Sequence, residues 1–147
     1  MRRAILTGWL TAGILDITAA SIWSGIYGRS PMRMLQGIAF GAFGPESLQM
    51  GWKSAAFGLF THFLIALTAT TLFVFASKAL PWLAQHPFIS GPLYGIVVYY
   101  FMQFVVIPLS RIPARPTPAK SLVIGLVIHM VCVGLPIALA ASRNRDA

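Results

Sequence analysis

The chain has 147 residues, of which 57% are apolar and only 10% are charged, and its net charge is +8. Soluble domains carry charge at about a quarter of their positions, so this composition excludes an ordinary soluble protein. The basic residues flank long apolar segments, which is typical of membrane proteins and argues against nucleic acid as a partner.

Four apolar segments are each long enough to cross a bilayer, which requires about 20 consecutive apolar residues in a helix. They cover residues 4–27, 54–77, 92–110 and 121–142. The first follows Met1-Arg2-Arg3 as the apolar part of a signal peptide would, but it is long enough to span. We therefore expect an all-α polytopic membrane protein with four transmembrane helices surrounded by lipid bilayer.

A short helix is expected between the first two spans. Ser30 and Pro31 are residues typical of an N-cap and of the first helical position. The helix should continue to about Phe40, and Gly44-Pro45 should end it. Because it is too short to span, it should lie in the membrane interface or enter as a re-entrant element.

Two further connectors are expected. Residues 81–87 read as a short turn carrying an interfacial tryptophan between the second and third spans. Residues 110–120 contain three prolines and three cations, so this connector before the fourth span should be extended and solvated.

An internal duplication organises the sequence. Residues 53–62 reappear as residues 120–129, with Lys, Ser, Gly, Leu and His coinciding at an offset of 67, and Arg-x-Pro-x-Arg recurs at residues 29–33 and 111–115 at an offset of 82. The difference between the offsets predicts an insertion at about residues 34–48. We expect one membrane domain, residues 1–147, built from two tandem parallel hairpin repeats at 4–77 and 92–142.

The repeats place six cations at one end of the bundle. These candidate contacts for an anionic headgroup or phosphate-bearing substrate are Arg29, Arg33, Lys53, Arg111, Arg115 and Lys120. The alternative is that they are solvated cations that only fix topology. The other end carries five cations, so the charge balance does not set the orientation, and we expect both termini to be cytoplasmic.

Three ionisable side chains lie inside the predicted spans, where their cost favours positions that face the bundle interior. They are Asp16, His62 and His129. The duplication predicts equal depth for the two histidines, with Asp16 within a few ångströms of that level. Three polar residues complete the candidate site: Ser21 and Gln103, which are equivalent in the repeats, and Cys132, one turn after His129.

Four roles are open for this candidate site. The histidines could bind one haem axially, or hold a metal ion with Cys132. Asp16 could tune a histidine in a proton relay, since histidine changes charge near neutral pH. Alternatively, neutral histidines could form hydrogen bonds between helices and serve only packing.

No catalytic motif is visible, because the sequence contains no Gly-rich phosphate loop, no Cys-x-x-Cys and no paired carboxylates. We expect a non-catalytic protein: an accessory subunit of a membrane complex, or a small solute or proton transporter. The alternative is an electron-transfer module that binds haem or a metal ion through His62 and His129. Partners would be other membrane subunits or a second copy of the chain.

Four sequence patterns resemble a family of small four-span bacterial inner-membrane proteins of unknown function. They are Pro-Met-Arg-Met-Leu-Gln-Gly-Ile-Ala at 31–39, Gly-Leu-x-x-His-Phe-x-Ile-Ala at 58–66, Tyr-Gly-x-x-Val-Tyr at 94–99 and His-Met-x-x-Val-Gly-Leu-Pro at 129–136. The resemblance implies a bacterial inner membrane and brings no activity. The chain departs from the family at Gln49-Met50-Gly51, where a Gly-Gly pair is expected.

Overall fold

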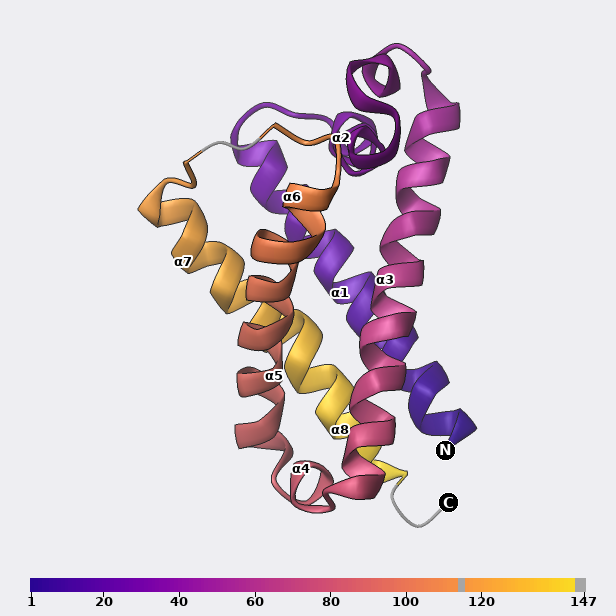
Figure 1. Ribbon diagram of the computed structural model, residues 1–147, viewed down its shortest axis with the longest axis vertical. Coiled ribbons are helices and arrows are strands. Elements are labelled where there is room, and N and C mark those ends of the chain that lie inside the picture. The colour runs from indigo at the N-terminus through magenta and orange to yellow at the C-terminus, as the bar shows by residue number, and fades with distance from the viewer. Residues whose placement is uncertain (114–115, 145–147) are drawn as a thin grey trace.

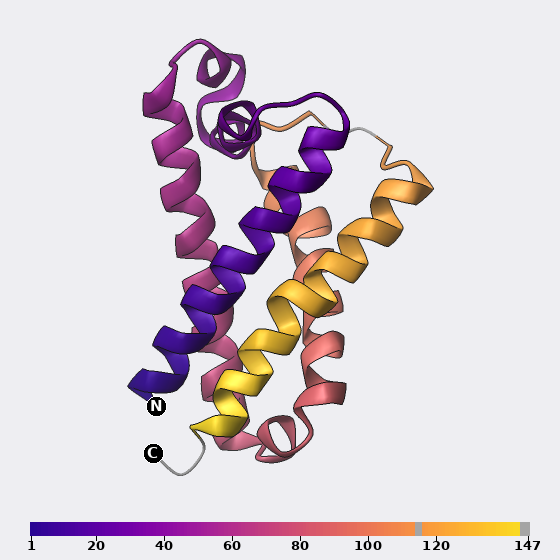
Figure 2. The ribbon, with the colours of Figure 1, turned by 180° about the vertical axis from the view of Figure 1, so that it is seen from behind.

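The computed structural model describes residues 1–113 and 116–144, and those residues form helices and connectors with no strand. Four helical segments within them are long and apolar enough to cross a membrane: Arg2–Ile26, Trp52–Ala79, Pro87–Leu109 and Ala119–Arg143. The predicted all-α fold with four spans is confirmed. The first span begins and the fourth span ends at the same end of the bundle (Figures 1 and 2).

The chain forms two long hairpins. The first contains α1 (Arg2–Ile26), α2 (Pro31–Phe43), the 3₁₀ turn η1 (Gly44–Leu48) and α3 (Trp52–Ala79). The second begins with α4 (Trp82–Gln85), α5 (Pro87–Phe101), the π-helical η2 (Met102–Val106) and α6 (Ile107–Leu109). It returns through α7 (Ala119–Ile128), the π-helical η3 (His129–Gly134) and α8 (Leu135–Arg143).

Small residues bring the spans close together. The core contains Ala12, Phe73, Ile137 and Ala138, packed where α1, α3 and α8 meet. Small side chains let membrane helices approach closely, and dispersion contacts then stabilise the bundle. The helices α3 and α5 meet in the half of the bundle nearer α4, where the Tyr94 hydroxyl donates to the Ala69 carbonyl at 2.7 Å.

Helix α2 forms as the sequence predicts and lies across the end of the bundle away from the termini (Figure 1). The Ser30 hydroxyl accepts a hydrogen bond from the Arg33 amide at 3.2 Å, and Gly44 ends the helix with φ of +69°. The helix packs so closely on α3 at Gly58 that a Cβ there would collide with the Leu35 carbonyl. The absence of a side chain at Gly58 therefore allows α2 to pack directly against α3.

The third span begins earlier than predicted, at Pro87 instead of Pro92. Pro87 suits the first helical position, and Pro92 lies near enough to the start that it removes only one helical hydrogen bond. Part of the predicted turn at 81–87 is the short helix α4.

The final connector is not simply solvated. The Arg111 amide donates to the Gly41 carbonyl at 2.9 Å, which ties the connector to α2. Residues 114–115, and therefore Arg115, lie outside the described residues.

Two π-helical segments, η2 and η3, interrupt the second hairpin, and the sequence analysis did not predict them. Each is followed within two residues by a proline, Pro108 or Pro136. Proline lacks an amide hydrogen and its ring clashes with the carbonyl four residues earlier, so the preceding turn widens. The corresponding stretches of α1 and α3 contain no proline and remain α-helical.

Candidate functional site

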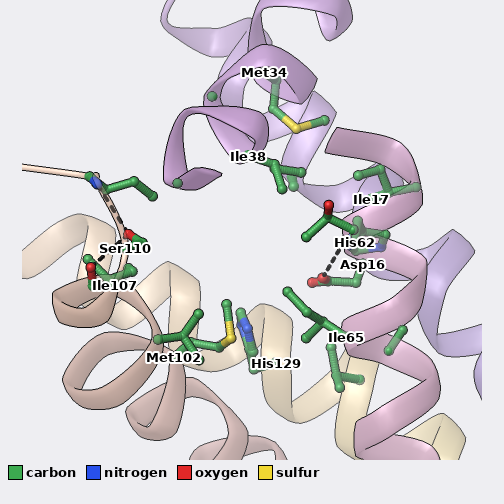
Figure 3. Close-up of a pocket in the computed structure, with 18 of the residues that line it drawn as sticks. Asp16, Ile17, Met34, Ile38, His62, Ile65, Met102, Ile107, Ser110 and His129 are labelled. Carbon is green, nitrogen blue, oxygen red and sulfur yellow. Dashed lines mark hydrogen bonds and ion pairs between the residues drawn. The ribbon is translucent and has the colours of Figure 1, made fainter. Parts of the chain in front are cut away.

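A cavity of about 620 Å³ lies inside the bundle between α1, α2, α3, the α5–α6 segment and η3. Figure 3 shows its walls, with α2 across one end and His129 near the other. Most of the lining is apolar, but Asp16, His62 and His129 all line it. The three ionisable residues predicted to face the bundle interior therefore share one cavity.

Asp16 and His62 lie side by side on facing helices (Figure 3). The His62 Nδ1 atom is 3.9 Å from an Asp16 carboxyl oxygen, and the two side chains are only 12% and 18% exposed. This separation allows an ion pair but is too long for a direct hydrogen bond. The agreement in depth predicted for these two residues holds.

The other ring nitrogen of His62 is fixed by α1. Its Nε2 lies 2.9 Å from the Gly13 carbonyl oxygen, and because a carbonyl can only accept, Nε2 carries a proton. A neutral ring would then turn the Nδ1 lone pair toward the Asp16 carboxylate. One proton, held on either group, removes that repulsion and makes the contact favourable. The geometry thus suits a pair that carries one proton.

The predicted repeat matches His129 to His62, but the two histidines form different hydrogen bonds. Its Nδ1 lies 2.9 Å from the Gly125 carbonyl of its own helix, and its ring packs edge-on against Tyr99 with centroids 5.3 Å apart. Nδ1 is therefore the protonated nitrogen of the neutral ring. Among the described residues Nε2 has no hydrogen-bond partner, so His129 offers an acceptor on the cavity wall.

This arrangement bears on the haem and metal alternatives. Both nitrogens of His62 are engaged, so axial ligation of haem would require Nε2 to leave the Gly13 carbonyl. In residues 1–113 and 116–144 no group of three or more His, Cys, Asp or Glu side chains is placed to hold a metal ion. Those alternatives remain predictions, and the contacts of His62 favour a role in holding a proton.

The three remaining polar candidates are partly buried but do not line the cavity: Ser21, Gln103 and Cys132. Gln103 lies in η2, one helical turn after Tyr99 of α5. Ser24, which the sequence analysis missed, does line the cavity. It lies eight residues after Asp16, on the same helical face, so helical periodicity counted from Asp16 would have found it.

Two of the five predicted cations that lie in the described part of the chain are on the cavity. Arg29 and Arg33 line its connector end, and the Nη1 atom of Arg33 donates to Leu48 O at 2.8 Å and to Gln36 at 3.2 Å. Among the other described cations, Lys53 is exposed, and Lys120 lies 5.7 Å from the Trp23 ring centroid. Arg111 contributes its amide to the contact with Gly41.

The fold and the cavity together define the class of this chain as a multi-pass helical membrane protein with a polar site inside its bundle. Comparisons with family models, curated proteins and solved structures found no match to this chain.

Proposed function

We propose that this protein is a proton-linked transporter of a small solute in the bacterial inner membrane. The cavity is the solute site, and Asp16 with His62 forms the proton carrier. The observation that carries this proposal is the placement of an acid and a base 3.9 Å apart on the wall of a cavity between membrane-spanning helices.

The free-energy cost of placing the ionisable side chains of Asp16 and His62 inside membrane spans supports a role beyond packing. Ionisable side chains in a span cost about 2.5–3.5 kcal/mol each on insertion scales, and they commonly mark proton or substrate pathways. A cavity of this volume is also within the range of small-molecule sites. Entry of a solute would displace water from beside the pair, which strengthens its electrostatic interactions and links occupancy to proton binding.

Other charged groups near the pair belong to the same mechanism. His129 lines the cavity from η3, and Arg29 and Arg33 line the end covered by α2. A solute in the cavity would lie against the pair and these basic side chains together, so its binding would be coupled to proton binding by direct contact.

Proton movement in liposomes tests the proposal. The purified chain is reconstituted into liposomes with a pH-sensitive dye inside, and the internal pH is followed after an external pH jump. We expect faster equilibration than in protein-free liposomes. Asp16→Asn should reduce the protein-dependent rate at least tenfold, because an amide keeps the shape of the carboxylate but does not titrate.

Glu46→Gln is the matched control, because Glu46 is an exposed acid in η1 outside the cavity. It should leave the rate unchanged, and both variants should keep the wild-type melting temperature within a few degrees. An Asp16→Asn protein that moves protons as fast as wild type would overturn the proposal. So would a wild-type rate equal to that of empty liposomes. Because the chain is reconstituted alone, activity would also argue against a role only as an accessory subunit.

A further inference from the structure

Positive charge without a matching carboxylate gathers at one end of the cavity. Arg29 and Arg33 both line that end, whereas Asp16, the carboxylate on the lining, is paired with His62. Within residues 1–113 and 116–144, the Asp16–His62 contact is the only ion pair. The connector end of the cavity therefore favours an anion.

The inserted helix holds one of these cations in place. The side-chain amide of Gln36 donates to the Gly51 carbonyl at 3.0 Å, and the Gly41 carbonyl accepts from Arg111 of the final connector. The helix is thus tied to both hairpins. Arg33 uses Nη1 for its two protein contacts, which leaves the Nε and Nη2 donors of its guanidinium for a ligand.

Below this charged end the cavity walls are apolar. Ile38 of α2, Ile65 of α3 and Met102 of η2 line the middle (Figure 3), and Val98 and Val133 add to the apolar lining. The pair, His129 and the hydroxyl side chains of Ser24, Thr61 and Ser110 are the polar groups that interrupt the apolar lining away from the two arginines. A ligand that fills the cavity must therefore combine a charged group with an apolar body, because each part removes a different surface from water.

The volume restricts the size of that body. A water-sized group occupies about 30 Å³ in a liquid, so a cavity of about 620 Å³ holds roughly twenty such groups. This matches one medium-length alkyl chain with its head group. It is too small for a phospholipid with two full-length chains.

We propose that the cavity binds a single-chain amphipathic anion, with its carboxylate or phosphate at Arg29 and Arg33 and its chain between α3 and α5. Arginine donors form strong, geometrically specific hydrogen bonds with both kinds of anionic group. As the identity of the transported solute, this inference rests on the proposed function. As a statement about binding, it does not require proton movement.

Equilibrium binding of radiolabelled dodecanoate to the purified full chain in a neutral detergent tests it. We expect saturable binding that dodecyl phosphate displaces and dodecanol does not. Comparing dodecanoate with dodecyl phosphate shows which anionic group is preferred. Arg29→Gln should weaken binding at least fivefold, and Arg29→Gln with Arg33→Gln should weaken it at least tenfold.

The chain offers matched controls. Lys53→Gln with Lys120→Gln removes two cations from the same end of the bundle but away from the cavity, and should leave affinity unchanged. Gly37→Leu should block binding, because Gly37 lines the cavity and a Cβ there meets no atom within 4 Å. Gly37→Leu still tests the inference if the loss of Arg33 disturbs α2, because it leaves both arginines in place.

Several outcomes would overturn the inference. Equal displacement by dodecanol would show an apolar site with no preference for an anion. Full displacement by inorganic phosphate would show that no alkyl chain is needed, and tighter binding of phosphatidylglycerol would show that the site prefers a two-chain lipid.

The failure of the binding inference can be distinguished from the failure of the proposed transport function. If dodecanoate binds as expected but the wild-type protein moves no protons, the binding inference stands and the proposed transport function fails. If protons move but Arg29→Gln leaves binding unchanged, only the binding inference fails.

Discussion

The two hairpins bring together, in different ways, residues that the predicted repeat matches to one another. Gly13 meets His62 in the first hairpin, and Gly95 meets His129 in the second. In the first, the histidine ring crosses to the glycine carbonyl on α1. In the second, the histidine backbone lies against the glycine, and the ring turns back to Gly125 on its own helix. His62 is therefore protonated at Nε2 and His129 at Nδ1, although the two histidines occupy matching sequence positions.

Closer approach of the backbones explains the difference. In the second hairpin, glycines at 91, 95 and 134 leave no space for a side chain between α5 and η3. In the first, the Phe63 ring fills the space beside Gly13 and packs edge-on against both Trp9 and His62. The looser hairpin has room for the Asp16–His62 pair, whereas in the tighter one Nε2 of His129 has no hydrogen-bond partner among the described residues.

The largest expected loss of stability comes from adding a methyl group at the close contact between α5 and η3. In Gly95→Ala the new methyl would lie 2.6 Å from the Met130 Cα and closer still to the His129 carbonyl. Backbone on the facing segment cannot move aside cheaply, so we expect a loss of about 3 kcal/mol or more, near the upper end for overpacking. At about 2–4 °C per kcal/mol, the melting temperature in detergent should fall by roughly 6–12 °C.

Gly13→Ala is the equivalent change in the first hairpin. Its methyl would lie 2.5 Å from Cε1 of Phe63, a side chain that can rotate, so we expect a smaller loss of about 1–2 kcal/mol. An equal or larger fall for Gly13→Ala would contradict the proposed difference in packing between the two hairpins.

A smaller difference in stability should distinguish substitutions at the two histidines. His62→Ala removes a hydrogen bond between helices, worth about 0.6 kcal/mol on average in membranes, and leaves Asp16 without its partner. His129→Ala removes a bond within its own helix and an aromatic edge contact. We expect His62→Ala to lower stability by about 1 kcal/mol more than His129→Ala, measured as melting temperature in the same detergent.

A double-mutant cycle tests the cause of that difference. Adding Asp16→Asn to His62→Ala should restore part of the lost stability, because the unpaired carboxylate is removed. The same substitution added to His129→Ala should restore none. If both backgrounds respond alike, Asp16 does not depend on His62.

The sequence predicted the spans and the short inserted helix because long apolar segments, an N-cap and a glycine-proline break are local signals. It also placed Asp16 and His62 at one depth, because residues counted from the same membrane face rise equally along helices. The sequence predicts the start of the third span at Pro92, which is later than the observed start at Pro87, because a proline near a helix start is tolerated and does not mark the boundary.

What the sequence could not show depends on packing between distant segments. The opposite bonding of His62 and His129 follows from how closely each hairpin packs, which the matching sequence positions do not reveal. Ser21 and Gln103 were selected by repeat alignment, yet neither lines the cavity, because alignment between repeats does not report which face of a helix turns inward. The π-helical turns rotate that face further in the second hairpin.

The smallest predicted effect uses a glycine that has no packing role. A Cβ on Gly25, near the end of α1, would meet no atom within 4 Å, and the repeat-equivalent position in the second hairpin is Ile107. Gly25→Ala should therefore stabilise the chain by up to about 1 kcal/mol, because alanine has the higher helix propensity. The melting temperature in detergent should rise by roughly 2–4 °C. A lower melting temperature would mean that Gly25 packs against a molecule other than this chain. In that case the end of α1 near Gly25 would be an interface in the membrane.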